Sequence, residues 1–401
     1  MDIFKRFFLM VKKNKKQIMR YSPLLLVLIV LVVTFVSCWQ RVYPPEIETE
    51  PPVSEETPSE EPSPFPEPLP TPEPTDVEEI EPEPEPEPED VYTGPVNPLT
   101  GLPVENDISN NRPLAIMINN HPAAMPQLGV SKADIIYEIL AEGDITRMLA
   151  LYQDITDADK IGSIRSARHY FVDVAQSYDA IYVFAGGSPQ AYSAISARRI
   201  TYLDGVLGVR ADSFFRDPYR RDVLRMDSEH TLVTTSELLA KWLPTYNIRL
   251  EHEEGYERDL AFVEDGTPED GLPATELTVD FFQKTTSFSY DDEDGLYYLS
   301  QFGRPYIDGN DDTQLSFTNI LILKTDVSWI PGDTAGRRNV RTTGTGVGHF
   351  VCGGEYVDIE WSRDDNDSQF SYTLQDGTAL ALGCGKTYVC IIPAANVVDF
   401  G

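Results

Sequence analysis

The stretch AIYVFAGGSPQAYSAISA, residues 180–197, determines the fold class that we expect for the first half of the chain. Its first six residues form an apolar run rich in β-branched and aromatic side chains, which is typical of a buried strand. A pair of glycines then ends the run. Ser188 can cap a helix with its hydroxyl group, and Pro189 suits the first helical position. The stretch therefore predicts a strand, a turn and a helix to about Ala197, as in α/β proteins.

Further elements of the same two kinds lie on both sides of this stretch. Short apolar runs predict strands, and a Ser before an apolar periodic segment predicts the start of a helix. The run 133–140 has a periodicity that fits a helix and a strand equally, so both remain open. The other elements expected are strands at 114–118, 147–152 and 231–235, and helices from Ser166 to about Tyr178 and from Ser236 onward.

The second half of the chain has a different pattern. Its apolar runs are short, rich in aromatic and β-branched residues, and separated by Gly- and Asp-rich turns, which is typical of hairpins. The fold class expected is therefore α+β: an α/β-type domain with a mixed sheet at 96–245, followed by a mainly β domain at 246–400. The runs in question are 277–282, 288–290, 296–299, 319–323, 355–361, 370–373 and 388–392.

The N-terminus carries the pattern of a membrane anchor. Residues 1–22 are basic and precede an uncharged apolar segment at 23–39. Cations collect on the cytoplasmic side, so this order places the rest of the chain outside. The segment is either the signal peptide of a lipoprotein, with Cys38 lipidated in the lipobox-like sequence Phe35-Val-Ser-Cys38, or an uncleaved transmembrane helix. Both hold the protein at the outer face of the bacterial cytoplasmic membrane.

The next segment, 40–95, has the composition of a disordered spacer. Residues 42–90 contain eighteen acidic and no basic side chains, and sixteen prolines lie between 44 and 90. Such a segment has little to bury and stays extended, because proline favours polyproline II and like charges repel each other. At about 3.1 Å per residue it reaches on the order of 150 Å. We expect a stalk that holds the folded part away from the membrane.

Composition excludes several classes of protein. The net charge is −33, which argues against a nucleic-acid binder. Four cysteines in 401 residues cannot form a disulfide-based scaffold or a Cys-rich zinc protein, and no metal or cofactor motif is present. Cys352 and Cys384 each lie next to glycines at predicted turns. A disulfide between them and two free thiols are both open.

Several stretches resemble the YerB-like lipoproteins, a two-part bacterial family whose domains carry a domain-of-unknown-function label. The resemblance covers most of residues 95–395 and implies an envelope-anchored protein of two domains, without implying a reaction. The stretches are NPLTGLP (97–103), RPLAIMINN (112–120), ADIIYEILAEGDITRMLALYQD (133–154), IGSIRSAR (161–168), FAGGSP (184–189), GTGVGHFVCGGEYVDIEW (344–361) and GKTYVCIIP (385–393).

A locally basic region marks the candidate ligand site. Residues 147–225 hold eleven cations and nine acids, although residues 91–401 carry a charge of −22. Guanidinium groups beside a helix start can bind a carboxylate or phosphate, and we expect such a cleft. The alternative is that the arginines form structural ion pairs with Glu138, Glu142 and Asp144. The residues expected to line the cleft are Asn119, Asn120, Arg147, Arg165, Arg168, Gly186, Gly187 and Ser188, with Glu138 and Glu142 nearby.

The function expected is therefore non-catalytic: a membrane-tethered, extracytoplasmic binding or scaffold protein that holds an anionic cell-wall ligand. The alternative is an envelope hydrolase. Glu138 and Glu142 are four residues apart and would share a face of a strand or helix, as the acid and base of glycoside cleavage need to. Ser188 is a weaker candidate nucleophile, because its pattern GGSPQ differs from G-x-S-x-G.

Overall fold

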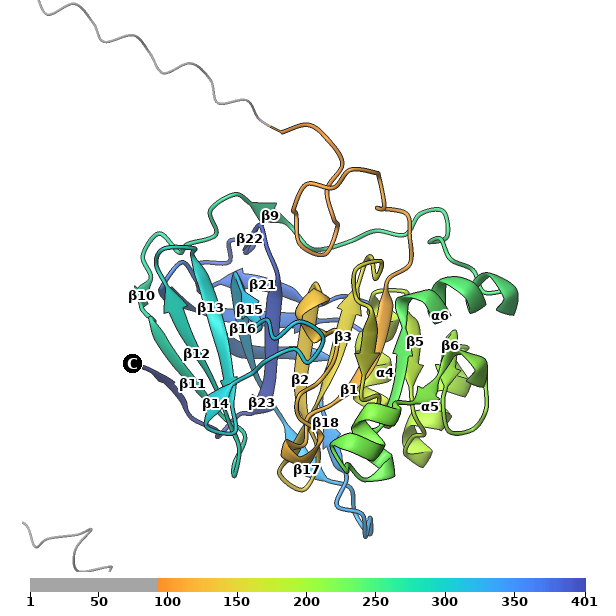
Figure 1. Cartoon of the computed structure of the whole chain (residues 1–401). Helices are drawn as coiled ribbons and strands as arrows, with labels where there is room; N and C mark the ends of the chain where they lie inside the picture. The colour runs from red at the N-terminus through yellow and green to blue at the C-terminus, as the bar shows by residue number, and fades with distance from the viewer. Residues whose placement is uncertain (1–91) are drawn as a thin grey trace, which may run out of the picture. The chain divides into compact units, whose positions relative to one another are not determined.

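The computed structural model describes residues 92–401, which lie in one compact unit running from Pro88 to Gly401 (Figure 1). This part of the chain consists mostly of strands, with few helices. The basic segment 1–22, the membrane segment 23–39 with Cys38, and the spacer up to residue 91 lie outside the described residues. Within residues 92–401, none of the helices has the length and apolar character needed to cross a membrane.

One sheet of eleven strands runs through both halves of the chain (Figure 1). The two halves meet where β23 from the second half pairs in parallel with β2 from the first, from Ile135 opposite Thr387 to Ile139 opposite Ile391. In order across the sheet, the strands are β10 (Leu272–Pro273), β20 (Glu355–Arg363), β19 (Gly344–Cys352), β16 (Asn319–Thr325), β23 (Thr387–Pro393), β2 (Ile135–Glu142), β3 (Ile145–Tyr152), β1 (Leu114–Asn119), β5 (Ile181–Phe184) and β6 (Tyr202–Asp204), with β21 (Ser371–Leu374) beside β20.

A second, smaller sheet covers one face of this central sheet. Its residues Leu277, Phe288 and Leu299 share a buried apolar core with Ile136 of β2 and Tyr388 of β23. The core thus joins the two halves through apolar packing as well as through strand pairing. The strands of the second sheet are β14 (Arg304–Pro305), β13 (Leu296–Gln301), β12 (Thr285–Asp291), β11 (Glu276–Asp280) and β24 (Val398–Phe400), with β15 (Ser316–Phe317) beside β13.

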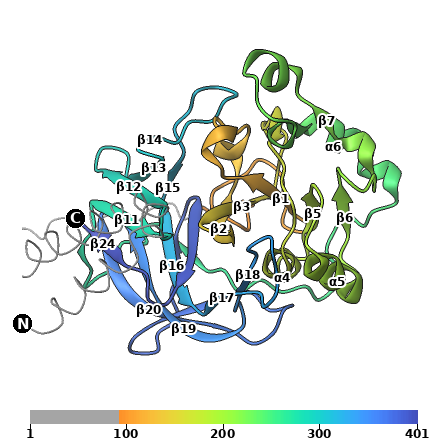
Figure 2. The ribbon, with the colours of Figure 1, turned by 90° about the horizontal axis from the view of Figure 1, so that it is seen from below.

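Two helices, α4 (His169–Ser177) and α5 (Pro189–Arg198), pack against the opposite face (Figure 2). Tyr170, Phe171 and Ile195 share the second buried core with strand residues such as Tyr137 and Leu149. The central strands are therefore covered on both faces, which explains their almost continuous apolar sequences.

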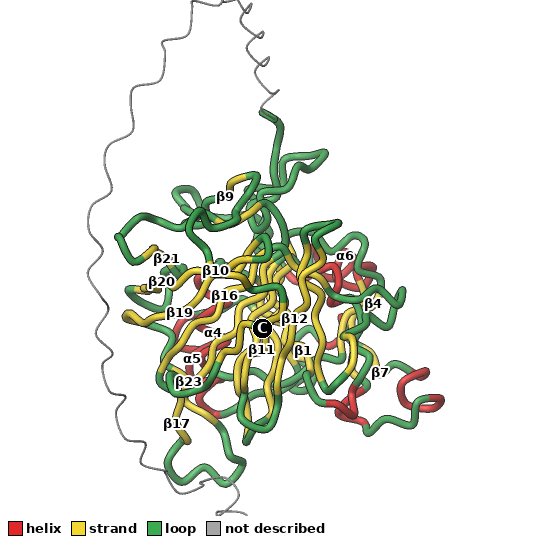
Figure 3. The backbone as a smooth tube through the Cα atoms, turned by 90° about the vertical axis from the view of Figure 1, so that its left-hand side faces the viewer, coloured by secondary structure: helices red, strands yellow, loops and turns green. Residues whose placement is uncertain are grey.

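Short elements complete the structure, and loops connect them along the outside of the two sheets (Figure 3). They are α6 (Ser236–Trp242), the strands β4 (Lys160–Gly162), β7 (Phe215–Arg216), β8 (Leu232–Thr235), β9 (Phe262–Val263), β22 (Leu382–Gly383), β17 (Val327–Trp329) and β18 (Arg338–Val340), and the short helical turns η1 (Pro122–Ala124), η2 (Val130–Lys132), η3 (Ala211–Ser213), η4 (Tyr219–Val223), η5 (Ser228–His230) and η6 (Pro244–Tyr246).

The strand and helix expected at 180–197 are confirmed as β5 and α5. Ser188 caps α5, since its Oγ accepts a hydrogen bond from the N–H of Ala191 at 3.1 Å. The ambiguous run 133–140 forms strand β2, because it lies at the centre of the sheet with both faces buried. Tertiary packing resolves what periodicity alone leaves open.

One of the expected helix starts is wrong. The helix expected from Ser166 begins at His169, because Ala167 is still extended and forms a β-bridge with Gly187. The helix expected from Ser236 onward is confirmed as α6, but its cap is Thr235 and not Ser236, since Thr235 Oγ1 accepts a hydrogen bond from the N–H of Leu238 at 3.1 Å.

The disulfide between Cys352 and Cys384 is not formed, and all three described cysteines are free. Cys352 is buried, whereas Cys384 is partly exposed and its Sγ lies 3.6 Å from the carbonyl oxygen of Gly101.

We expect the described thiols of the native protein to react with iodoacetamide in the order of their exposure. Cys384 should be alkylated first, and Cys352 and Cys390 only after unfolding. Burial raises the pKa of Cys352 to about 11 and holds that of Cys390 well above its usual value, so the reactive thiolate is scarce at both. Peptide mass spectrometry after timed labelling checks the order. Equal rates for Cys352 and Cys384, or a linked pair of their peptides, would contradict the structure.

Candidate functional site

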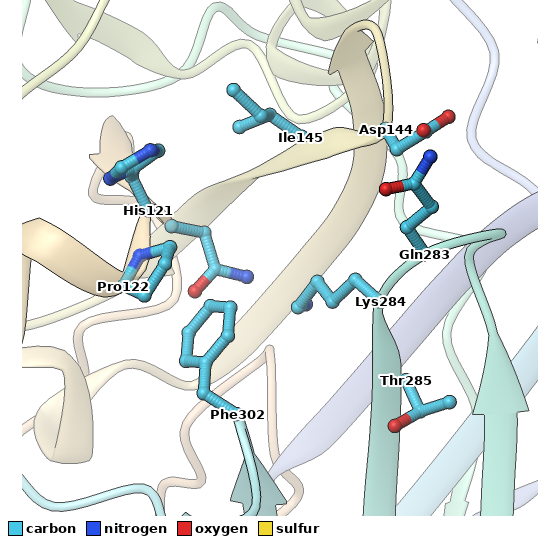
Figure 4. Close-up of a pocket in the computed structure, with 9 residues that line it drawn as sticks. His121, Pro122, Asp144, Ile145, Gln283, Lys284, Thr285 and Phe302 are labelled. Atoms are coloured by element: carbon cyan, nitrogen blue, oxygen red, sulfur yellow. The ribbon is translucent and has the colours of Figure 1, made fainter. Parts of the chain in front are cut away.

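A cavity of about 340 Å³ opens between the two halves of the chain, at the end of β1 (Figure 4). Its volume lies at the lower end of the range of about 300–1,000 Å³ that is usual for small-molecule sites. The first half contributes the segment after β1 and the β2–β3 turn, and the second half contributes the β11–β12 and β13–β14 turns. The lining residues are Asn120, His121, Pro122, Asp144, Ile145, Gln283, Lys284, Thr285 and Phe302.

The lining combines polar groups with apolar side chains. Asn120 follows directly on the buried strand β1, so the strand fixes its position at the sheet edge. Lys284 enters from the β11–β12 turn and extends toward Phe302 (Figure 4), with its Nζ 5.5 Å from the centre of that ring. Ile145 and Phe302 add apolar surface. Convergent polar groups in a partly apolar cavity are what a small polar ligand requires.

A buried ion pair between Glu138 and Lys284 forms the floor beneath this cavity. Glu138 comes from β2 and is fully buried, and Lys284 follows the second sheet's first strand. Both carboxylate oxygens accept further hydrogen bonds. The other donors are Thr146 Oγ1 at 2.6 Å, Thr286 Oγ1 at 2.7 Å, Tyr388 Oη at 2.8 Å, Asn120 Nδ2 at 2.9 Å and Gln301 Nε2 at 3.1 Å.

The electrostatics of this network indicate a structural role for Glu138. Burial lowers the pKa of Lys284, and the neighbouring carboxylate opposes that shift. Burial and Glu138 raise the pKa of Tyr388, which therefore stays protonated and donates. A carboxylate with one cation and five further donors is saturated and has no lone pair to offer a substrate. Glu138 thus joins the two halves.

Glu142 lies on the other side of the sheet from Glu138. Glu138 bonds to Thr146, whereas Glu142 bonds to Arg147, the next residue of β3, at 2.8 Å. Consecutive strand residues face opposite sides, and a register irregularity between Leu140 and Glu142 produces the switch. The expectation that the two glutamates share a face is therefore wrong.

Arg147 and Arg168 both form ion pairs with Glu142. Burial lowers the pKa of each to about 10, so both remain charged at neutral pH. Asp144 also has an arginine partner, but it is Arg338, at 3.5 Å. The structural ion pairs that the sequence offered as the alternative to an anion cleft are present for Arg147 and Arg168. Anion binding by these two residues stays a prediction.

Arg165 has a looser environment than the other two arginines. It lies 3.5 Å from the exposed carboxylate of Glu229, and its Nε, like that of Arg168, is buried with no hydrogen-bond partner among the described residues. Burial and the like charge of Arg147 lower the pKa of Arg165. Because its guanidinium is partly exposed and its carboxylate partner is exposed, Arg165 is the best remaining candidate for the predicted anion site.

The remaining predicted site residues lie away from the cavity. Asn119 turns toward Ser163, 3.3 Å away, and toward His230. Ser188 is buried at the start of α5, where its hydroxyl caps the helix. Gly186 adopts φ +71°, which suits glycine, and its N–H donates to Asp204 Oδ1 at 2.8 Å. Of the ten predicted residues, Asn120 is the one that lines the cavity described above.

Two histidines connect the cavity with the surroundings of Arg165. His121 lines the cavity, and its ring stacks on His230 with 5.4 Å between ring centroids. Asn119 Nδ2 lies 2.9 Å from His230 Nδ1, so the amide donates to a neutral imidazole. Burial and the charge of Arg165 both lower the pKa of His230. His121 and His230 thus lie between the cavity and Arg165.

Sequence reasoning missed most of the cavity. Gln283, Lys284 and Phe302 lie in hairpin turns of the second half, where no local pattern indicates a ligand site. One signal was available: each of these turns has a Phe where Gly or Asn is usual. Among residues 92–401, no cluster of His, Cys, Asp and Glu has the make-up of a metal site.

Comparison with known proteins gives concordant matches. The N-terminal domain described as "Protein of unknown function (DUF3048)" matches residues 99–249, and its C-terminal domain matches residues 277–389. The chain is similar to "Putative lipoprotein YerB" of Bacillus subtilis (strain 168), with 30% identity over 303 residues, 74% of this chain and 86% of that protein. The crystal structure of the YerB protein from Bacillus subtilis is similar with a TM-score of 0.66 and 29% identity, over 76% of this chain and 99% of that one.

Proposed function

The chain belongs to the DUF3048 family, and from this premise we propose that it is a membrane-tethered, extracytoplasmic binding protein that holds an anionic envelope ligand in the cavity between its two halves. The name of the Bacillus subtilis relative, "Putative lipoprotein YerB", supports the tether. The basic N-terminus before an apolar segment supports the outside location. The scaffold of two joined sheets supplies a rigid frame for the cavity.

The observation that carries the proposal is the set of polar side chains that converge on one cavity from both halves of the chain. The candidates for hydrolysis are all engaged elsewhere. Glu138 is saturated and buried, Glu142 is held by two arginines, and Ser188 caps a helix. Binding therefore has more support than catalysis.

Arg165 is the residue that we assign to the ligand's anionic group. Its bond to Glu229 is long, and Glu229 is exposed enough to move aside. A carboxylate or phosphate in that place would accept a charge-assisted hydrogen bond from Arg165 Nη2, the atom that now faces Glu229. We propose that the ligand extends from the cavity past the two stacked histidines to this position.

Isothermal titration of the fragment 88–401 with soluble cell-wall fragments, phosphate and sulfate tests the proposal. The fragment is one compact unit with its own cores. We expect Arg165→Ala to weaken binding by about 1.5–3 kcal/mol, the value of a hydrogen bond to a charged group. The matched control is Arg341→Ala, which removes a surface arginine paired with Asp326. Equal binding by wild type and Arg165→Ala would contradict the assignment, and no binding of any probe would contradict the proposal.

Metabolic labelling with a fatty-acid analogue tests the form of the tether. If Cys38 carries a lipid, the wild-type protein should be labelled, and Cys38→Ala should lose the label completely. Cys390→Ala is the control, because that thiol is buried in the folded part and should not affect labelling. An unlabelled wild-type protein that still sediments with membranes would show that segment 23–39 is an uncleaved helix.

A further inference from the structure

Both hairpin turns beside the cavity hold a phenylalanine in a strained backbone conformation. Phe282 has φ +71° and Phe302 has φ +56°. Each is the first of two central turn residues, since Phe281 bonds back to Lys284 and Gln301 pairs with Arg304. Tight hairpin turns normally place Gly or Asn at this position, because a Cβ is disfavoured there. A bulky residue in this conformation costs about 1–3 kcal/mol and is typical of functional sites.

The ring of Phe282 belongs to an exposed aromatic wall next to the cavity. Phe282 is 49% exposed and Trp329 is 53% exposed, although both are large apolar residues. The guanidinium carbon of Arg338 lies 3.3 Å from the ring centroid of Trp329 and 5.7 Å from that of Phe282. Arg338 itself is only 5% exposed. One buried cation therefore supports both rings from the inner side and leaves other ring surface open to solvent.

This wall is continuous with the cavity. Phe282 precedes the cavity residue Gln283, and Arg338 Nη2 lies 3.5 Å from the carboxylate of Asp144, which also lines the cavity. Two hydrogen bonds from Arg338 to the carbonyl oxygen of Gly143, at 2.8 and 3.1 Å, fix the wall to the β2–β3 turn. Amide and carboxylate groups thus stand beside exposed aromatic rings.

We propose that the aromatic wall of Phe282 and Trp329 binds a sugar ring, and that the ligand of the cavity is therefore a glycan. This inference rests on the binding function proposed above and names its ligand class. A pyranose has an apolar C–H face that packs on an aromatic ring, and hydroxyl groups at its rim that both donate and accept hydrogen bonds. Asp144, Gln283 and Asn120 offer acceptors and donors of the matching kind.

The charge around the wall disfavours other aromatic-binding ligands. Arg338 already occupies the position at which a cation would bind the two rings, so a quaternary ammonium group or a Lys-rich peptide would be repelled. A proline-rich peptide also docks on aromatic grooves. It offers few hydroxyl groups to the polar side chains of the cavity, so it fits the site less well and serves as a comparison in the test.

Titration of the fragment 88–401 with chitotetraose, an uncharged N-acetylglucosamine tetramer, tests the inference. We expect wild type to bind and Phe282→Gly to bind at least tenfold more weakly without loss of melting temperature, because glycine relieves the strained turn. The control is Asp312→Gly, which replaces an exposed residue at φ +60° that does not line the cavity, and it should leave affinity unchanged. Trp329→Ala should weaken binding similarly, whereas Trp242→Ala should not.

Each result separates this inference from the proposed function. If charged wall fragments bind with dependence on Arg165 but chitotetraose does not, the glycan assignment is overturned and the binding function stands. The same holds if Phe282→Gly and Trp329→Ala both bind chitotetraose as tightly as wild type. The glycan assignment would also be overturned if the fragment bound a peptide with the sequence EPEPEPEPED (residues 81–90) and did not bind chitotetraose. If no wall fragment binds, both proposals fail.

Discussion

Replacing Lys284 by Met should lower the free energy of unfolding by about 3–5 kcal/mol, the usual effect of removing one partner of a buried ion pair. Lys284 is buried against Glu138, which is itself fully buried. Without the cation, Glu138 is left charged inside the core that joins the two halves. The penalty follows from this uncompensated charge, since methionine preserves most of the apolar volume of lysine. Urea unfolding of the fragment 88–401 measures the change.

Two variants separate the buried charge from other effects of the substitution. The double variant Lys284→Met, Glu138→Gln should recover at least half of the loss, because the charge itself is gone. Lys132→Met is the matched control, since Lys132 forms an exposed and long ion pair with Asp311 at 3.9 Å. It should change stability little. A loss below about 1 kcal/mol for Lys284→Met would contradict the role that we give to the pair.

Replacing Asp308 by Ala is expected to cost roughly 2–5 kcal/mol, because it leaves several buried donors without an acceptor. Asp308 belongs to the second half and is fully buried. Its carboxylate accepts from the N–H of Gly129 at 2.9 Å and from the N–H and Oγ of Ser131 at 2.9 and 2.8 Å, all in the first half. Each unsatisfied buried donor costs about 1–3 kcal/mol. Thermal or urea unfolding checks the loss.

The matched control for the Asp308→Ala variant is Asp376→Ala. Asp376 also accepts a backbone hydrogen bond, from Thr378 at 2.8 Å, but it does so within an exposed turn. Water can replace that bond, so the unfolding transition should hardly move. If Asp308→Ala and Asp376→Ala lower the free energy of unfolding equally, the contact between the halves contributes no more to stability than a hydrogen bond in a surface turn.

Much of the secondary structure could be predicted because the signals are local. The run from Ala180 and the cap at Ser188 specify β5 and α5 within twenty residues. The single sheet through both halves could not be predicted. It depends on Ile135 pairing with Thr387, and pairing between residues so far apart leaves no periodic trace in the sequence.

The site was less predictable than the fold for the same reason. Asn120 was found because a polar residue after a buried strand is a local signal. Lys284 was missed because its partner Glu138 is 146 residues away in the sequence. From the sequence alone, a lysine in a turn is expected to be exposed to solvent. Glu142 was misplaced because the irregularity in β2 shifts its side chain to the other face, and sequence spacing assumes regular alternation.

Hydrogen exchange with and without bound wall fragments tests the central claim most directly, because it shows where a ligand lies without assuming its identity. With the fragment 88–401 saturated by ligand, amides of the turns 281–284 and 301–304 should exchange more slowly, since both turns border the cavity. The turn 291–295, at the other end of the β12–β13 hairpin, should be unaffected. Unchanged exchange in both cavity turns at saturation would contradict the account.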